Sequence, residues 1–255
     1  MQHGEKIVNI EEELKKIDKL EKLLRELNSA DKALFADKIN SVEKELHTIK
    51  LQNFNNVNNI CDFSLPQEWT PQNEYLKLDV LNKNSNDYTL CESIFKKTLN
   101  SSTLVSITRI QNTELWKNYC FAKYQLKTKG NSEEKMLFHG TRTTDPKLIY
   151  EGKEEGFDMR FAQDGMWGRA IYFHTNASFS NDFRFTTNSR TNIMLLAKVL
   201  VGNIATRKND SSLRFPPFLE NSKKDRYDSI KSNFDERYMI YNNLRAYPAF
   251  IIEYK

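Results

Sequence analysis

Apolar residues in the first fifth of the chain recur at helical spacing. Between Ile7 and Leu51, Leu and Ile return every three or four positions in a segment that is rich in Glu and Lys and contains neither Pro nor Gly. Residue types typical of a helix cap interrupt the pattern near Asp31. The pattern predicts a helical or coiled-coil extension over residues 1–52, either as two helices or as one broken coiled coil, and it leaves self-association through this segment open.

The pattern changes at the Asn-rich stretch 53–61, which is typical of a linker. Beyond it, short apolar and β-branched runs bounded by turn residues predict strands over residues 75–81, 104–110, 135–138, 170–173, 192–200, 238–241 and 249–254. Helical spacing predicts helices over residues 88–99, 113–126 and 145–154. The late strands follow one another without helices long enough for parallel crossovers. We therefore expect residues 62–255 to form an α+β domain with a mostly antiparallel sheet.

Composition narrows the class of protein. The 255 residues carry 38 basic and 34 acidic side chains, a net charge of +4 that is too small to indicate a nucleic-acid partner. No run approaches the roughly 20 apolar residues of a membrane span, and the N-terminus lacks the order of a signal peptide, so an intracellular location, cytoplasmic or nuclear, is expected. The three Cys and four His show no ligand spacing, and we expect no metal.

One candidate site begins at Leu137-Phe138-His139-Gly140-Thr141, at the end of a predicted strand. Gly140 has no side chain, so a ligand could reach its backbone N–H and C=O, and Thr141 adds a hydroxyl. A planar ligand that bears an amide would suit this backbone. An isolated His at a strand end is also often a structural residue, so both interpretations stay open.

A second candidate stretch supplies aromatic rings beside hydroxyl groups. Small residues precede Tyr172 in Gly168-Arg169-Ala170-Ile171-Tyr172-Phe173, and Ser180 lies near Phe183 and Phe185. A ligand ring could stack on one of these aromatic side chains while a hydroxyl binds its edge. Ordinary core packing would produce the same stripe.

Several ordered motifs together resemble one known family. "MLFHGT", "GRAIYFHTNASFS" and "YNNLRAYPAFIIEY", with "ITRIQNTELWKNY" upstream, are similar to the catalytic domain of the poly(ADP-ribose) polymerases over roughly residues 62–254. The similarity is greatest to the mono-ADP-ribosylating, macrodomain-associated members. The resemblance implies the split-sheet ADP-ribosyltransferase fold, NAD⁺ as the consumed cosubstrate and a protein acceptor.

The resemblance also implies roles for particular residues. His139 matches the family's His that binds the nicotinamide-side ribose, Gly140 the residue whose backbone pairs with the carboxamide, Tyr172 the Tyr that stacks on nicotinamide, and Ser180 the hydroxyl on the carboxamide. Thr141, beside Gly140, is also expected to bind NAD⁺. The second stacking aromatic is either Phe183 or Phe185, and Arg160 is a candidate for the adenosine side.

Two positions depart from the family pattern. Ala170 replaces a common Gly, which leaves the pocket open if φ there is negative. Arg237 stands where polymerising members have Glu, and the neighbouring Glu236 would reach that place only through a bulge. The catalytic candidates are thus His139, Tyr172 and either Arg237 or Glu236.

The third position of the signature decides the expected chemistry. With Arg237 there, we expect a mono-ADP-ribosyltransferase that releases nicotinamide, or an inactive module that binds NAD⁺ or ADP-ribose. With Glu236 there, a polymerising enzyme becomes possible, because a carboxylate could activate an acceptor hydroxyl. A coiled-coil scaffold whose C-terminal domain only presents a surface is a third class.

Overall fold

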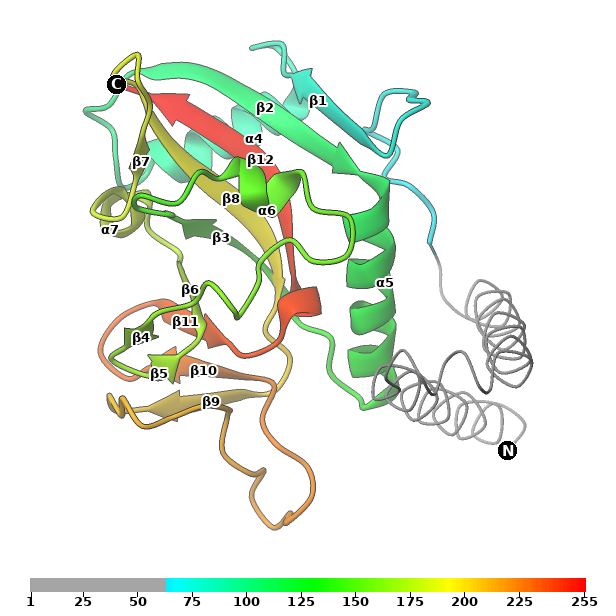
Figure 1. Ribbon diagram of the computed structural model, residues 1–255, viewed down its shortest axis with the longest axis vertical. Coiled ribbons are helices and arrows are strands. Elements are labelled where there is room, and N and C mark those ends of the chain that lie inside the picture. Colours follow the sequence, from blue (N-terminus) through cyan, green and yellow to red (C-terminus); the bar gives the residue numbers. More distant parts are fainter. Residues whose placement is uncertain (1–62) are drawn as a thin grey trace, which may run out of the picture. The chain divides into compact units, whose positions relative to one another are not determined.

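One large sheet organises the described part of the chain. The structure is a computed structural model that describes residues 63–255, so the predicted extension, the linker and Asp62 lie outside the described residues. The sheet runs in the order β1-β2-β12-β8-β3-β6-β11-β10-β9, with a short β7 beside β8 (Figure 1). Its strands are β1 (Leu76–Val80), β2 (Leu104–Asn112), β3 (Glu134–His139), β6 (Ile171–His174), β7 (Phe185–Thr186), β8 (Asn192–Leu200), β9 (Ile204–Arg207), β10 (Ser229–Ser232), β11 (Arg237–Ile240) and β12 (Ala246–Tyr254).

The predicted antiparallel arrangement is confirmed, with one exception. Every neighbouring pair in this sheet is antiparallel except β9 with β10. β3 pairs with β8 along its whole length but shares only one paired position with β6, where Phe138 lies opposite His174. The sheet therefore divides into two halves at the boundary between β3 and β6.

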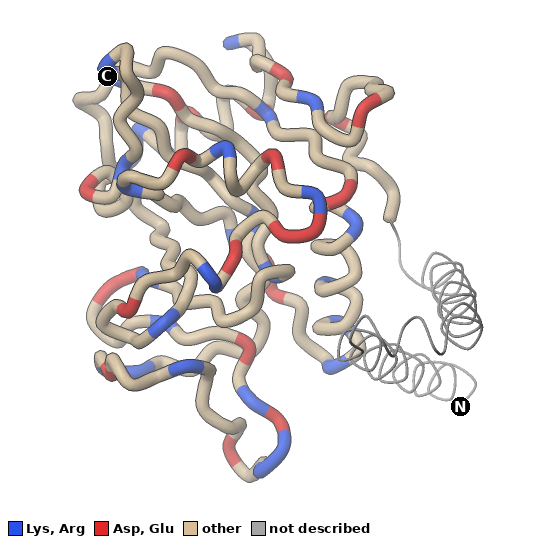
Figure 2. The backbone as a smooth tube through the Cα atoms, viewed as in Figure 1, with Lys and Arg blue, Asp and Glu red and all other residues tan. Residues whose placement is uncertain are grey.

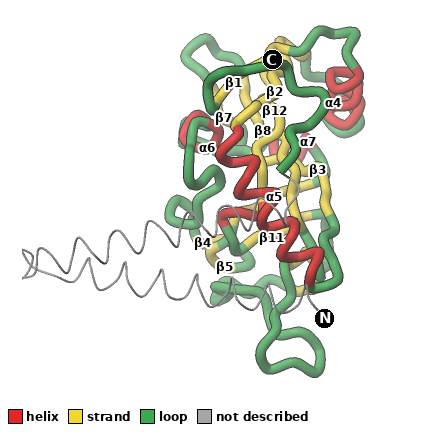
Figure 3. The backbone as a smooth tube through the Cα atoms, turned by 90° about the vertical axis from the view of Figure 1, so that its right-hand side faces the viewer, coloured by secondary structure: helices red, strands yellow, loops and turns green. Residues whose placement is uncertain are grey.

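Two helices cover one face of the larger half of the sheet. In α4 (Asn86–Lys96), Ser85 caps the N-terminus, and in α5 (Thr113–Thr128) the Asn112 side chain accepts from the backbone N–H groups of Glu114 and Leu115. Figure 3 shows α5 running along the strands. The buried residues of these helices follow helical spacing, and they are Tyr88, Cys91 and Phe95 in α4 and Leu115, Tyr119, Ala122 and Leu126 in α5.

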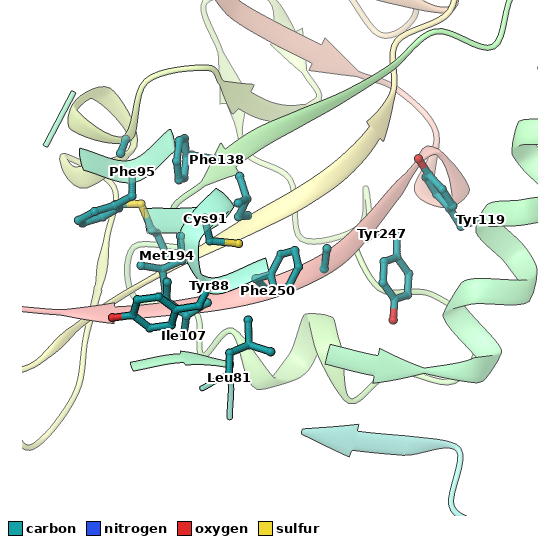
Figure 4. Close-up of a cluster of buried hydrophobic side chains, with 14 of the residues drawn as sticks. Leu81, Tyr88, Cys91, Phe95, Ile107, Tyr119, Phe138, Met194, Tyr247 and Phe250 are labelled. Atoms are coloured by element: carbon teal, nitrogen blue, oxygen red, sulfur yellow. The ribbon is translucent and has the colours of Figure 1, made fainter. Parts of the chain in front are cut away.

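The sheet buries both of its faces in this half. Along β8, Met194 and Leu196 pack in the cluster beneath α4 and α5, whereas Leu195 and Ala197 belong to a second cluster on the opposite face. This alternation follows from the two-residue period of a strand. Figure 4 shows the first cluster, in which rings from the helices meet apolar side chains of β2, β3, β8 and β12.

Several boundaries differ from the sequence prediction. The predicted helix over residues 145–154 is only the single turn α6 (Lys147–Tyr150). The side chain of Asn112 donates to the carbonyl oxygens of Tyr150 and Gly152, at 3.0 and 2.7 Å, and so holds the chain that follows this turn beside the start of α5. The short elements β4 (Asp164–Gly165), β5 (Gly168–Arg169), β7, β9, β10, α7 (Ala177–Asn181) and η1 (Asn243–Arg245) were not predicted.

Basic and acidic residues are interspersed along the described chain rather than separated by sign (Figure 2). Within residues 63–255, no helix combines the length and apolar character that crossing a membrane requires.

Candidate functional site

A cavity of about 630 Å³ lies at the boundary where β3 and β6 separate. Its lining comes from the end of β3, from β6, β11 and α7, and from the connection between α6 and β4. The volume is within the range of about 300–1,000 Å³ that is typical of ligand pockets. Seven of the ten residues predicted from the sequence line this cavity, namely His139, Gly140, Thr141, Tyr172, Ser180, Phe183 and Arg237.

The imidazole of His139 is fixed by one hydrogen bond and two aromatic rings. Its Nδ1 lies 2.8 Å from the carbonyl oxygen of Tyr172, and because a carbonyl can only accept, Nδ1 carries the proton. The rings of Phe157 and Phe173 lie 5.1 and 5.3 Å from the imidazole, centroid to centroid. Burial lowers the pKa of His139, and the hydrogen bond to Tyr172 opposes this change. His139 is therefore neutral at neutral pH, with Nε2 as a hydrogen-bond acceptor.

Gly140 allows two backbone segments to approach closely. A Cβ atom at this position would lie 2.3 Å from the carbonyl oxygen of Phe183 and 2.7 Å from that of Ser180. The neighbouring Arg142 N–H donates to the same Phe183 oxygen at 2.7 Å. The absence of a side chain at Gly140 thus brings the end of β3 against the residues that follow α7. The hydroxyl of Thr141 is buried at this junction without a hydrogen-bond partner in the described chain.

The phenol of Tyr172 is held in place by the loop before its own strand. Its hydroxyl donates to the carbonyl oxygen of Gly168 at 2.7 Å and accepts from the N–H of Trp167 at 3.0 Å. Gly165 packs directly on this phenol, since a Cβ there would lie 2.6 Å from the hydroxyl oxygen. Burial raises the pKa of Tyr172, so the phenol is neutral. The ring of Tyr172 is thus an anchored surface in the cavity lining.

Helix α7 and the residues that follow it supply a hydroxyl and two aromatic rings. Ser180 is buried, and its hydroxyl has no hydrogen-bond partner within residues 63–255. The ring of Phe179 stacks on His174 at 4.4 Å, and Phe183 lies beneath the guanidinium of Arg142 at 4.4 Å. The site therefore combines flat apolar surfaces with unsatisfied polar groups, which is the pattern of a pocket for a planar, polar ligand.

The register of β11 decides which of Arg237 and Glu236 faces the cavity. Arg237 lies opposite His174, Met239 lies opposite Tyr172, and the pairing continues without a shift to the end of the strand. Because opposite residues of an antiparallel pair share a face, Arg237 lies on the side of Tyr172 and His174. It lines the cavity, with its side chain 13% exposed.

Three predicted residues lie outside the cavity lining, and the reason differs for each. Glu236 precedes β11, and its half-exposed side chain pairs with Lys231 at 2.5 Å. Phe185 lies in β7, where it pairs with Ile193 of β8. Arg160 is exposed, because ion pairs at 2.6 and 2.7 Å hold it against the carboxylates of Asp158 and Glu155.

Ala170 is not among the residues of positive φ, so its replacement of a Gly leaves the backbone unstrained. Within the described residues, no group of three or more His, Cys, Asp or Glu side chains is arranged to hold a metal ion.

The sequence prediction missed cavity residues that share elements with the predicted ones. His174 follows Tyr172 by two positions on β6, so strand alternation could have identified it. Phe179 was not assigned to the site, and it lines the cavity beside Ser180. Arg142 and Met166 carry no pattern in the sequence, because the loops that contain them reach the cavity only through tertiary packing.

Comparisons with known proteins agree with this geometry. Residues 85–233 match the family model described as the poly(ADP-ribose) polymerase catalytic domain. A probable poly [ADP-ribose] polymerase of Dictyostelium discoideum is 37% identical over 184 residues, which are 69% of this chain and 51% of that protein. Two further relatives are protein mono-ADP-ribosyltransferases of the mouse (Mus musculus). PARP12 is 29% identical over 75% of this chain and 27% of that protein. PARP11 is 27% identical over 76% of this chain and 67% of that protein. The matched part of this chain thus corresponds to about half of the Dictyostelium protein and about a quarter of PARP12.

Proposed function

The chain belongs to the poly(ADP-ribose) polymerase catalytic domain family, and from this premise we propose that it transfers one ADP-ribose unit from NAD⁺ to an acceptor and releases nicotinamide. The observation that carries the proposal is that one cavity brings together His139, Gly140, Tyr172 and Ser180. Names of two relatives, the mono-ADP-ribosyltransferases PARP11 and PARP12, support the transfer of single units.

The nicotinamide end of NAD⁺ has a suitable place in the cavity. In this proposal the pyridine ring stacks on Tyr172 and Phe183, and its carboxamide bonds to the Gly140 backbone and to the hydroxyl of Ser180. The anchored phenol of Tyr172 supports this arrangement, because it is held in place before any ligand binds, and the unpartnered hydroxyl of Ser180 is available to the carboxamide. Thr141 adds a second buried hydroxyl without a partner, which supports a polar ligand in the same cavity.

His139 positions the ribose beside the nicotinamide. Its Nε2 accepts a hydrogen bond from a ribose hydroxyl in this proposal, while Nδ1 remains bonded to the Tyr172 carbonyl. A neutral imidazole suits this role, because a protonated Nε2 could only donate. The lowered pKa of His139 supports the neutral form at physiological pH.

The reaction then depends more on orientation than on a catalytic carboxylate. Cleavage of the bond between nicotinamide and ribose produces a ribose with oxocarbenium character, and the acceptor atom attacks that carbon. Holding the ring on Tyr172 and the ribose on His139 would align the leaving group and the attacked carbon, which is the contribution that positioning makes to such rates. Arg237 cannot act as the general base that chain growth requires, so single units are the expected product.

A catalytically inactive module that binds NAD⁺ or ADP-ribose is the second candidate. The observation that favours it is the position of Arg237, whose positive charge lies in the same cavity as the proposed oxocarbenium centre. A cation disfavours the development of positive charge nearby. The two candidates bind the same ligand and differ in whether nicotinamide is released.

Incubation with NAD⁺ that carries a label on the adenosine side separates the candidates. Transfer predicts labelled protein together with free nicotinamide in equal amounts. The inactive module predicts saturable NAD⁺ binding without nicotinamide. Absence of both binding and release would reject the family assignment of the cavity and leave a scaffold role. His139→Ala is the matched control, because it should remove the transfer signal.

A further inference from the structure

β1 leaves one edge of the large sheet without a neighbouring strand in the described part of the chain. It is the first strand in the sheet order and pairs with β2 alone (Figure 1). The N–H of Leu81 donates to the Ile107 carbonyl oxygen at 2.9 Å, and the N–H of Thr113 donates to that of Tyr75 at 2.8 Å. Hydrogen-bonded positions alternate along an antiparallel pair, so β1 bonds to β2 through its odd-numbered residues. The backbone groups that point to the open edge therefore belong to Leu76, Leu78 and Val80.

Two side chains of this edge expose apolar surface. Leu78 is 42% exposed and Val80 is 69% exposed. Between them, Asp79 points to the face that α4 covers, because it bonds to Arg109, which also bonds to Asp87 of α4. Side chains alternate along a strand, so Leu78 and Val80 lie on the opposite face. An open edge that also carries exposed apolar side chains is a surface on which another strand can pair.

The charged side chains of β1 are not balanced within the described residues. Asp79 and Asp87 share the single guanidinium of Arg109, each at 2.8 Å, so this group has one negative charge in excess. The Oδ2 atom of Asp79 makes the contact, and its Oδ1 has no hydrogen-bond partner within residues 63–255. Lys77 donates to the carbonyl oxygen of Pro71 at 3.0 Å and forms no ion pair with a described carboxylate. β1 thus carries one unpaired cation and one carboxylate that can accept another.

We propose that β1 pairs with β1 of a second copy of this chain, antiparallel and centred on Leu78, so that the two sheets join across a two-fold axis. In this register Leu78 lies opposite Leu78 of the second copy, and Leu76 lies opposite Val80. Each of these pairs can exchange two backbone hydrogen bonds, because their N–H and C=O groups point to the open edge. On the other face, Lys77 of each copy lies opposite Asp79 of the other.

The two charges of β1 select this partner and this register. Charged side chains on an edge strand usually oppose pairing, but Lys77 and Asp79 have opposite signs and are equally distant from Leu78. A parallel pair in register would set Lys77 opposite Lys77, and an antiparallel pair centred on Asp79 would set like carboxylates opposite each other. The proposed pair instead places each Lys77 beside a carboxylate at a position without backbone hydrogen bonds, where side chains approach most closely.

The proposed interface leaves the cavity open in both copies. β2, β12, β8 and β3 separate β1 from β6 in the sheet order, and no residue of β1 lines the cavity. The inference therefore concerns assembly and does not depend on the proposed function.

Cysteine cross-linking of the full chain tests the register. In the proposed pair the two copies of position 78 are opposite each other with Cα atoms about 5.5 Å apart, which permits a disulfide. The two copies of position 80 lie four residues apart along the strands, ~14 Å, which does not. We expect Leu78→Cys to form a cross-linked dimer under mild oxidation, and Val80→Cys to show only the background of the parent protein, which has three Cys of its own.

Val80→Cys is the matched control because Val80 is the more exposed of the two residues. Random collision between molecules would therefore cross-link Val80→Cys at least as well as Leu78→Cys. Equal cross-linking of the two variants, or none above background in either, would overturn the proposal.

Sedimentation equilibrium measures the same association without a cross-link. We expect the parent protein to form a reversible dimer that weakens as salt is added. Lys77→Glu sets like charges opposite each other at both pairs, and the Kd should rise at least about 10-fold. Lys208→Glu makes the same change of charge beside β9, at the other end of the sheet order, and should keep the parent Kd.

Two results of this measurement would contradict the proposal. A parent protein that stays monomeric at every concentration would show that the edge does not pair with a second copy. A dimer with the same Kd in the parent and in Lys77→Glu would place the association on another surface, such as the predicted extension over residues 1–52. Thermal unfolding of each variant shows that a lost dimer does not come from a lost fold.

Discussion

The Nδ1 atom of His139 lies 2.8 Å from the backbone carbonyl oxygen of Tyr172, and this contact joins the two halves of the sheet at the cavity. β3 and β6 share only one paired position, so the imidazole provides a second connection where the strands separate. The same hydrogen bond fixes the tautomer of His139. This hydrogen bond therefore connects the two halves of the sheet and also orients His139 in the cavity.

Replacing His139 by Ala should remove transfer and leave the domain folded. The variant loses one hydrogen bond and a partly buried ring between Phe157 and Phe173, so we expect the free energy of unfolding to fall by about 1–3 kcal/mol. Nicotinamide release should fall at least about 100-fold, because a misplaced ribose loses its alignment. Thermal unfolding and nicotinamide release measure the two effects separately. A folded variant with the parent rate would reject the role of His139.

The lowered pKa of His139 predicts how the free energy of unfolding changes at acidic pH. In the unfolded chain the pKa of His is about 6.5, and burial lowers it in the folded state. Above about pH 6.5 both states are neutral and stability does not depend on this group. As pH falls below that value the unfolded state binds a proton first, so the free energy of unfolding decreases until the pH reaches the folded pKa. The pKa of His174 is also lowered, by burial and then by Arg237 against opposing carboxylates, and adds a loss of the same sign.

Thermal unfolding of the parent protein and of His139→Gln, followed from about pH 8 to about pH 5, measures this effect. The variant should lose less stability on acidification than the parent. Nicotinamide release should keep its rate through about pH 6.5, because His139 remains neutral in the folded state. A rate that halves near pH 6.5 with an unchanged difference between the two proteins would contradict the prediction.

The strands of the site could be predicted from the sequence because their signal is local. β8 was predicted at its observed bounds, and β6 and β11 were predicted within one residue at each end, since β-branched and aromatic runs bounded by turns identify buried strands. The alternation that places Arg237 in the cavity and Glu236 outside it also follows from a period of two.

The loops of the site could not be predicted in the same way. The chain at the end of α6 is held by Asn112, nearly forty residues earlier, whose side chain donates to the carbonyls of Tyr150 and Gly152. The choice between Phe183 and Phe185 depends on the pairing of β7 with β8, and β7 is only two residues long and was not predicted. Arg160 forms ion pairs with the neighbouring carboxylates of Asp158 and Glu155 and does not line the cavity, and sequence spacing could not show that these pairs form.

Tyr172 permits a test that separates the ring from the hydroxyl. Tyr172→Phe leaves the Gly168 carbonyl and the Trp167 N–H without their partner, so we expect the free energy of unfolding to fall by about 1–3 kcal/mol. The ring remains, and a benzamide-type mimic of nicotinamide should still bind. Tyr172→Ala also removes the stacking surface and should weaken that binding by about 1–3 kcal/mol. Calorimetric titration measures both variants, and equal binding by Tyr172→Ala and the parent would show that the ring is not the platform.

Residues after position 62 that precede β1 should prove part of the domain. The ring of Trp69 lies 5.8 Å from Trp116 and 6.2 Å from Tyr247, and Gln111 accepts from the N–H of Thr70 at 2.9 Å. A chain that begins at Phe63 should fold and bind the benzamide mimic. Trp69→Ala in the full chain should lower the free energy of unfolding by about 1–3 kcal/mol, since the ring is partly buried. Denaturant unfolding measures this, and an unchanged midpoint would mean that the segment is dispensable.

The position of Arg237 predicts the length of the product. Because Arg237 occupies the cavity side of β11 and Glu236 pairs with Lys231 outside it, we expect mass spectrometry of modified protein to show one ADP-ribose per site. Glu236→Gln should leave the product and its rate unchanged.

Arg237→Glu puts a carboxylate where the cation was, and we expect it to raise NAD⁺ hydrolysis, because a negative charge stabilises the developing oxocarbenium ion. Chain growth should still not appear, since elongation also requires a site for the end of the growing chain, and one substitution does not build it. The result that would contradict this account is long polymer from the unmodified protein that disappears in Glu236→Gln. It would mean that β11 shifts by one residue when NAD⁺ binds, so that Glu236 replaces Arg237 opposite His174.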